Sequence, residues 1–77
     1  MEVLRERRRL YHRFISAPHS IALFRFAERL CQREYDLLTM AVQEALVTAD
    51  ASEQVALRQR MDEVRRSRRH LQQQPKI

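Results

Sequence analysis

The amino-acid sequence predicts an all-α fold made of three helices. It contains no glycine, and proline occurs only at positions 18 and 75, so there are few residues for the tight turns that join strands. Alanine, leucine, arginine, glutamine and glutamate are abundant, and all of them favour helices. Apolar residues recur at helical spacing along most of the chain. A chain of 77 residues is long enough for one domain, so we expect a single helical domain over residues 1–77.

The first predicted helix covers residues 2–15. Its apolar positions form one arc, into which Arg7 intrudes: Val3, Leu4, Leu10, Tyr11, Phe14 and Ile15. Pro18 disfavours helix at Ala17 and suits the first turn of a following helix. We therefore expect the first helix to fold back at residues 16–20 and to cover the N-terminal half of the second helix, beside Phe24 or Phe26.

The second predicted helix covers residues 18–49 and would be ~48 Å long at 1.5 Å per residue. Its main apolar stripe consists of Leu23, Phe24, Ala27, Leu30, Cys31, Leu38, Ala41, Val42 and Ala45. Leu37, Met40 and Val47 form a second apolar line, interrupted by Glu44, and a helix with two apolar lines is packed on both sides. The first helix, at ~21 Å, is too short to reach Met40 and Val47. The sequence therefore predicts that this second line is open in the monomer.

The third predicted helix covers residues 51–73. Asp50 is a good N-cap, and Glu53 completes the pattern of a capping box. A heptad-like line follows, made of Leu57, Met61, Val64, Arg68 and Leu71. The short loop before this helix predicts an antiparallel hairpin with the long central helix. The polar tail, residues 74–77, is expected to fray.

One charged residue interrupts the apolar line of each long helix: Glu34 in the second and Arg68 in the third. An antiparallel register that matches Val64 with Leu38 brings these two charges to the same level. We predict that they form a partly buried ion pair that fixes the register of the hairpin. The alternative is that both side chains reach solvent independently along their long stems.

No arrangement of residues predicts catalysis, a metal site, a cofactor or a small-molecule substrate. His12, His19 and His70 are scattered, and none has the spacing to an acid or thiol that a metal ligand set needs. Cys31 is the single cysteine, which excludes an intramolecular disulfide and fits a reducing compartment. The charged N-terminus is unlike a signal peptide, and no apolar run approaches the ~18 residues of a membrane span. We expect a cytoplasmic protein that is not an enzyme.

The net charge is +5, and every basic residue except Lys76 is arginine. Arginine can grip phosphate or carboxylate with two hydrogen bonds, although a GC-rich genome would also favour its codons. Two clusters are candidate nucleic-acid contacts: Arg5, Arg8 and Arg9 in the first helix, and Arg65, Arg66 and Arg69 in the third. Neither cluster belongs to a recognisable DNA-binding motif. Binding of the first helix to an anionic membrane is less favoured, because its apolar residues are needed to cover the second helix.

The two apolar lines of the central helix predict a protein-interaction module: an adaptor, regulatory or chaperone-like protein. Leu37, Met40 and Val47 would pack against a protein partner or, most simply, a second copy in a homodimer. The alternative is a basic helical regulator that binds nucleic acid through its arginine-rich faces. The sequence favours the first function and leaves the second open.

Overall fold

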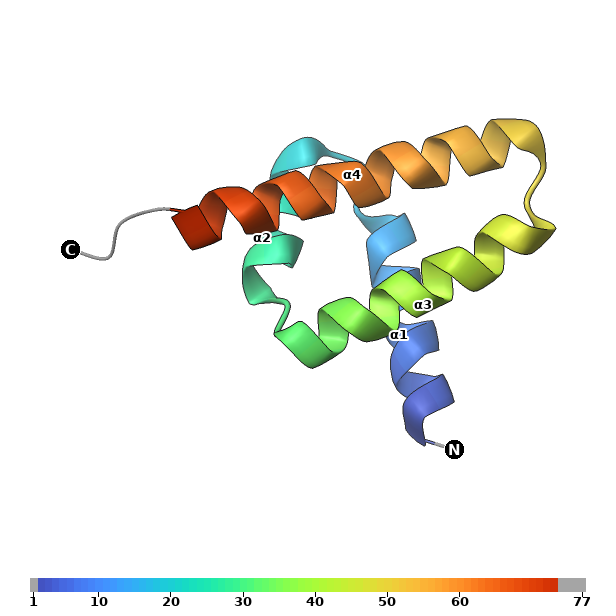
Figure 1. Ribbon diagram of the computed structural model, residues 1–77, viewed down its shortest axis with the longest axis horizontal. Helices are drawn as coiled ribbons and strands as arrows, with labels where there is room; N and C mark the ends of the chain where they lie inside the picture. The colour runs from blue at the N-terminus through green and yellow to red at the C-terminus, as the bar shows by residue number, and fades with distance from the viewer. Residues whose placement is uncertain (1, 74–77) are drawn as a thin grey trace.

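The computed structural model describes residues 2–73 of the chain, and these residues confirm the predicted all-α class. The described chain forms four helices rather than the three predicted (Figure 1). They are α1 (Glu2–Ser16), α2 (Ser20–Arg29), α3 (Gln32–Thr48) and α4 (Ala51–Gln73). The tail that we expected to fray, residues 74–77, lies outside the described residues.

The prediction of one helix over residues 18–49 was wrong, because the chain is extended at Leu30 and Cys31. Leu30 has φ −73° and ψ 122°, and Cys31 has φ −79° and ψ 169°. The Cys31 Sγ accepts the backbone N–H of Glu34 at 3.5 Å and lies 3.4 Å from the Glu34 Oε1. This pair resembles a capping box in which a thiol takes the place of the usual hydroxyl. Residues 31–34 therefore start a new helix without a proline or glycine.

The loop between α3 and α4 is closed by side chains at both of its ends. The Asp50 Oδ1 accepts the backbone N–H of Glu53 at 2.8 Å, which is the N-cap that the sequence predicts. The Gln54 Nε2 donates to the carbonyl oxygens of Leu46 and Ala49, both at 3.0 Å. These bonds satisfy carbonyls at the end of α3, where the helix itself offers no donor.

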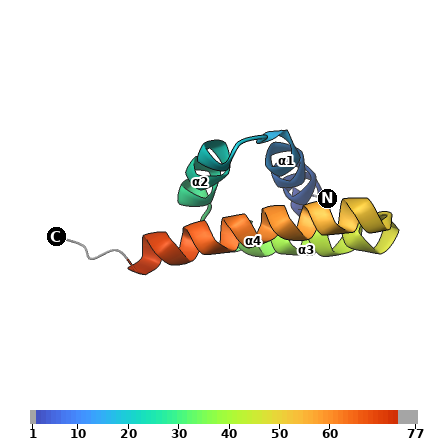
Figure 2. The same ribbon diagram turned by 90° about the horizontal axis from the view of Figure 1, so that it is seen from above.

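The helices form two layers, which Figure 2 shows from above. In one layer, α3 and α4 lie side by side. In the other, α1 packs on α3 and α2 packs on α4. We had expected the first helix to cover the segment around Phe24 and Phe26. Because the chain bends at Leu30 and Cys31, α2 does not continue the axis of α3 and packs on α4 instead. The first helix, α1, therefore packs on α3.

The core lies between these layers. Burying one large apolar side chain there stabilises the fold by ~1.5–3 kcal/mol. Within α1 only Leu10 and Phe14 are buried, while Val3, Leu4 and Ile15 remain nearly half exposed. The buried apolar residues are Leu10, Phe14, Leu23, Ala27, Leu30, Leu37, Leu38, Val42, Met61 and Val64. Leu37, which we predicted to face a partner, is therefore part of the core of its own chain, because α1 packs on α3.

Candidate nucleic-acid interface

Arg60 of α4 points into the molecule and holds the end of α1. Its Nη2 donates to the carbonyl oxygens of Phe14 and Ala17 and, at 3.2 Å, to that of Ile15. Its guanidinium lies 5.3 Å from the centroid of the Phe14 ring. The last carbonyls of a helix have no donor within the helix and favour a nearby cation. Arg60 is therefore a structural residue and is not available to a ligand.

Arg68 has the corresponding role at the break between α2 and α3. Its Nη1 donates to the carbonyl oxygens of Leu30 at 2.8 Å and Cys31 at 3.4 Å, and its Nη2 donates to the Gln32 Oε1 at 3.3 Å. Its guanidinium also lies 4.5 Å from the centroid of the Tyr35 ring. The charge in the apolar line of α4 thus donates to the Leu30 carbonyl and adds a second donor to the Cys31 carbonyl, which also accepts the backbone N–H of Tyr35 at 2.9 Å.

The predicted ion pair between Glu34 and Arg68 is not formed. The Glu34 Oε2 lies 3.6 Å from the Arg9 Nη2, and its Oε1 lies beside the Cys31 thiol. The reason is the break at Leu30 and Cys31, which places Glu34 in the first turn of α3 and directs Arg68 to backbone carbonyls instead. Each charge has a partner, but the prediction paired them wrongly.

Three ion pairs join α1 to α3. They are Arg7 with Glu44, Arg9 with Glu34 at 3.6 Å, and Glu6 with Arg33 at 3.2 Å. In the sequence, Arg7 interrupts the apolar arc of α1 and Glu44 interrupts the second apolar line of α3. In the structure these two charged residues form an ion pair with each other. Opposite charges that interrupt the apolar lines of two helices were a signal for this contact, and we did not use it.

The remaining arginines point outward, and most have no partner. Among residues 2–73, the arginines without a hydrogen bond or ion pair are Arg5, Arg8, Arg13, Arg25, Arg29, Arg58, Arg66 and Arg69. All six arginines that we predicted as nucleic-acid contacts are exposed. Two of them are already engaged: Arg9 with Glu34, and Arg65 with Tyr35 and Asp62.

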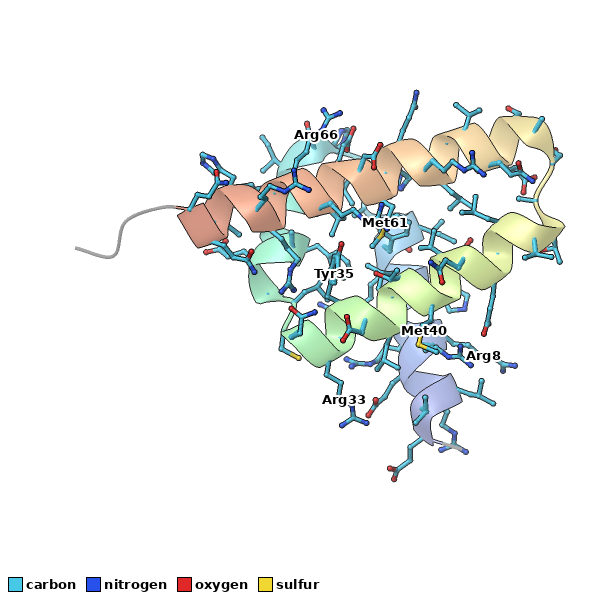
Figure 3. The ribbon with its side chains drawn as sticks, in the orientation of Figure 1. Arg8, Arg33, Tyr35, Met40, Met61 and Arg66 are labelled. Carbon is cyan, nitrogen blue, oxygen red and sulfur yellow. The ribbon has the colours of Figure 1, made fainter. Side chains whose placement is uncertain are left out.

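Three of these outward arginines, Arg58, Arg65 and Arg69, line a groove between α3 and α4, which we call the α3–α4 groove. Near the start of α3 it is a cavity of about 350 Å³ lined by Gln32, Tyr35, Arg65, Arg68, Arg69 and Gln72. Within it, the Arg65 Nε donates to the Tyr35 hydroxyl at 3.2 Å. Figure 3 shows Tyr35 between the two helices. An adjoining cavity of about 280 Å³ shares Arg65 and is lined further by Thr39, Val42, Leu46, Arg58, Met61 and Asp62.

The charge of the α3–α4 groove is unbalanced. No carboxylate lines its cavity near the start of α3, and Asp62, 3.9 Å from Arg65, is the one acid that lines the adjoining cavity. Sequence reasoning found Arg65 and Arg69 but missed Arg58, Arg68 and Tyr35. Arg68 was assigned to an ion pair with Glu34, and the cavity that it shares with Tyr35 depends on the bend at Leu30 and Cys31.

The predicted protein interface is reduced to two exposed side chains. Met40 is 48% exposed and Val47 is 84% exposed, whereas Leu37 is only 8% exposed. The other exposed residues of α3 are all polar: Gln32, Arg33, Asp36, Gln43, Glu44 and Thr48. Single exposed apolar residues are common on protein surfaces, so this face is weaker evidence for a partner than a continuous apolar patch.

Neither a metal-binding cluster nor a membrane-spanning helix occurs in the part of the chain that the structure describes. Within residues 2–73, no three histidine, cysteine or acidic side chains gather as a metal site would require. No helix of the described chain is both long and apolar enough to cross a membrane. In comparisons with known proteins, no family model, no curated protein and no solved structure matches this chain.

Proposed function

We propose that the protein binds nucleic acid through the α3–α4 groove. The observation that supports this most is the cavity in which Arg65 and Arg69 meet Tyr35 and two glutamines without a carboxylate, while Arg68, held by backbone carbonyls, adds its charge to the wall. Guanidinium groups form paired hydrogen bonds with phosphate, and glutamine and tyrosine side chains add further donors. A cavity with this lining is suited to the sugar–phosphate backbone of a nucleic acid.

The spacing of the arginines along α4 also suits a repeating anion. Arg65 and Arg69 are one turn apart, ~6 Å along the helix, and Arg58 lies ~10 Å before Arg65. Arg66 is exposed, makes no hydrogen bond or ion pair within the described residues, and points away from α3, so it lies beside the α3–α4 groove without lining it (Figure 3). Clustered charges of one sign repel each other, and they raise the local concentration of a polyanion.

The test is the salt dependence of binding to fluorescently labelled oligonucleotides, measured by anisotropy. We expect the affinity to fall steeply with salt, because binding phosphates releases counterions from the nucleic acid. Replacing Arg65, Arg66 and Arg69 together with glutamine should weaken binding similarly for all sequences, since phosphate contacts carry no sequence information. The slope of log affinity against log salt should decrease by about 2–3 for duplex DNA.

Arg33→Gln is the matched control for the single change Arg69→Gln. Both changes remove one exposed positive charge, but Arg33 is on α3, where it pairs with Glu6, and it does not line the α3–α4 groove. Arg69→Gln should weaken binding more than Arg33→Gln. Equal losses would mean that only the net charge matters, and an unchanged salt slope in the triple variant would exclude the α3–α4 groove as the site.

Self-association through α3 is a second candidate function, supported by the exposure of Val47 and Met40. As an adaptor, regulatory or chaperone-like protein, the chain would bury these residues against a second copy or another protein. We expect Met40→Glu with Val47→Glu to convert a dimer to a monomer while the helix content is retained, as measured by sedimentation and circular dichroism. Val55→Glu, at an exposed valine of α4, is the control. A wild-type monomer at high concentration would rule out the homodimer.

A further inference from the structure

A second basic cavity lies between α1 and α2, and we call it the α1–α2 groove. It has a volume of about 420 Å³ and is lined by Arg13 of α1 and by Arg25, Phe26 and Arg29 of α2. The other lining residues are small, among them Ala17 and Ala22. Its size is within the range of cavities that bind small ligands, ~300–1,000 Å³. None of the arginines predicted from the sequence as nucleic-acid contacts lines it.

The three arginines of the α1–α2 groove have no side-chain partner in the described part of the fold. None of them makes a hydrogen bond or ion pair with another residue in 2–73, and no acid lines the groove. The last carbonyls of α1 are already held by Arg60. A cation near the end of a helix is favourable, which accounts for Arg13 and Arg29 separately. It does not account for Arg25 or for the meeting of all three at one cavity.

Phe26 adds an aromatic side chain to this cavity. It is partly buried against the core and also lines the groove among the arginines. Proteins that bind single-stranded nucleic acid combine a positively charged groove with aromatic side chains on which bases stack. In a duplex the faces of the bases are covered by their neighbours, so only an unpaired base can use a ring in this way.

We propose that the α1–α2 groove binds single-stranded nucleic acid, with one base against Phe26 and the adjacent phosphates on Arg13, Arg25 and Arg29. This inference rests on the proposed function, because it takes the ligand to be a nucleic acid. It adds a preference for unpaired strands, which contacts between phosphate and the α3–α4 groove do not provide. An acidic peptide would satisfy the arginines but would leave the aromatic ring unused.

The experiment compares Phe26→Leu with Phe24→Leu. Leucine keeps an apolar side chain at each position, and Phe24 is on the same helix but does not line the groove. Binding is measured by anisotropy with a labelled oligothymidine and with a labelled duplex, after circular dichroism has shown that each variant is folded. We expect Phe26→Leu to weaken oligothymidine binding about tenfold, the loss of one stacked base, and to leave duplex binding unchanged. Phe24→Leu should leave both unchanged.

The two arginine sets provide a second comparison at equal charge. Arg13→Gln with Arg25→Gln and Arg29→Gln should weaken oligothymidine binding more than duplex binding. The glutamine changes at Arg65, Arg66 and Arg69 should weaken both ligands to a similar extent. If Phe26→Leu and Phe24→Leu bind oligothymidine equally well, or if a polyglutamate peptide displaces oligothymidine from the wild type as efficiently as unlabelled oligothymidine does, the proposal is overturned.

These outcomes separate the two proposals. If the duplex binds and depends on the α4 arginines, but Phe26 has no effect on oligothymidine, the α3–α4 groove stands and the α1–α2 groove is excluded. If oligothymidine binding depends on Phe26 while the triple variant of α4 binds both oligonucleotides normally, the α1–α2 groove stands and the α3–α4 groove is excluded. If neither oligonucleotide binds the wild-type protein, both proposals are wrong.

Discussion

Arginines on the two sides of α4 differ in what their guanidinium groups contact. Arg60 and Arg68 face inward and donate to backbone carbonyls at the ends of α1 and α2. Arg66 and Arg69 are exposed and make no hydrogen bond, ion pair or ring contact with another residue in the described part of the chain. The inward pair are eight residues apart, ~12 Å along the helix, so one face of α4 reaches the ends of both helices in the other layer.

The comparison shows that residue type alone does not indicate the role of a basic residue in this chain. An inward arginine donates to carbonyls at the ends of helices, where it adds to the backbone donors that the Phe14 and Cys31 carbonyls already have, and its charge is favourable at the C-terminal end of a helix. Its guanidinium also lies over an aromatic ring, Phe14 for Arg60 and Tyr35 for Arg68. An outward arginine gains none of these interactions and is available to an anionic ligand. Removing arginines from the two sides should therefore have different consequences.

The largest effect on stability is expected from Arg60→Met. Methionine keeps an apolar stem beside Phe14 but donates to none of the three carbonyls that Arg60 holds. Hydrogen bonds to a charged group contribute ~1.5–3 kcal/mol, so we expect the free energy of unfolding to decrease by about 2–3 kcal/mol. Urea unfolding followed by circular dichroism measures this change.

Arg66→Met is the control for Arg60→Met, because the same chemical change is made on the outward side of the same helix. Its effect on the free energy of unfolding should stay within about 0.5 kcal/mol, as is usual for exposed positions. Arg60→Lys should fall between the two, since an ammonium keeps the charge but lacks the planar fork of donors. Equal losses for Arg60→Met and Arg66→Met would remove the distinction between inward and outward arginines.

A smaller loss, about 1–2 kcal/mol, is expected for Arg68→Leu. Arg68 holds fewer carbonyls than Arg60, and two of its contacts, with Cys31 and Gln32, are solvent-exposed. A double-mutant cycle with Glu34→Leu tests the partner assignment directly. Because Glu34 lies beside Arg9 and Cys31, the two changes should add to within about 0.5 kcal/mol. A large coupling energy, or recovery of stability in the double variant, would restore the ion pair first predicted from the sequence.

The sequence predicts those parts of the fold that depend on local signals. Composition and apolar spacing predicted the helical class, and Asp50 with Glu53 predicted the start of α4. The break at Leu30 and Cys31 was missed because cysteine is not one of the usual N-cap residues, and neither proline nor glycine marks the position. The pattern Cys31-x-x-Glu34 was a local signal of a helix start, and it would have explained Glu34 without an interhelical partner.

The candidate sites were predicted less completely than the helices, because each depends on which helices meet. The exposure of Arg65, Arg66 and Arg69 followed from their positions on α4, away from its apolar line. The cavity that joins Tyr35 to Arg65 and Arg69, and the one that joins Arg13 to Arg25 and Phe26, depend on the bend between α2 and α3. Burial of Leu37 depends on the same bend, since it brings α1 onto α3.

The smallest expected effect is on the pH dependence of stability, and it comes from Tyr11, which packs against the core. Burial raises the pKa of Tyr11 above its usual value of 10.0, and the negative charge of Glu53 raises it further. The unfolded chain therefore loses the Tyr11 proton at lower pH than the folded protein does. The stabilisation from the neutral phenol is complete below about pH 10 and is lost as the pH rises through the pKa of the folded state. We expect thermal unfolding temperatures to decrease between about pH 9 and pH 11, and Tyr11→Phe to reduce that decrease, since phenylalanine has no proton to lose. An identical pH dependence in Tyr11→Phe and the wild type would show that the alkaline loss has another origin.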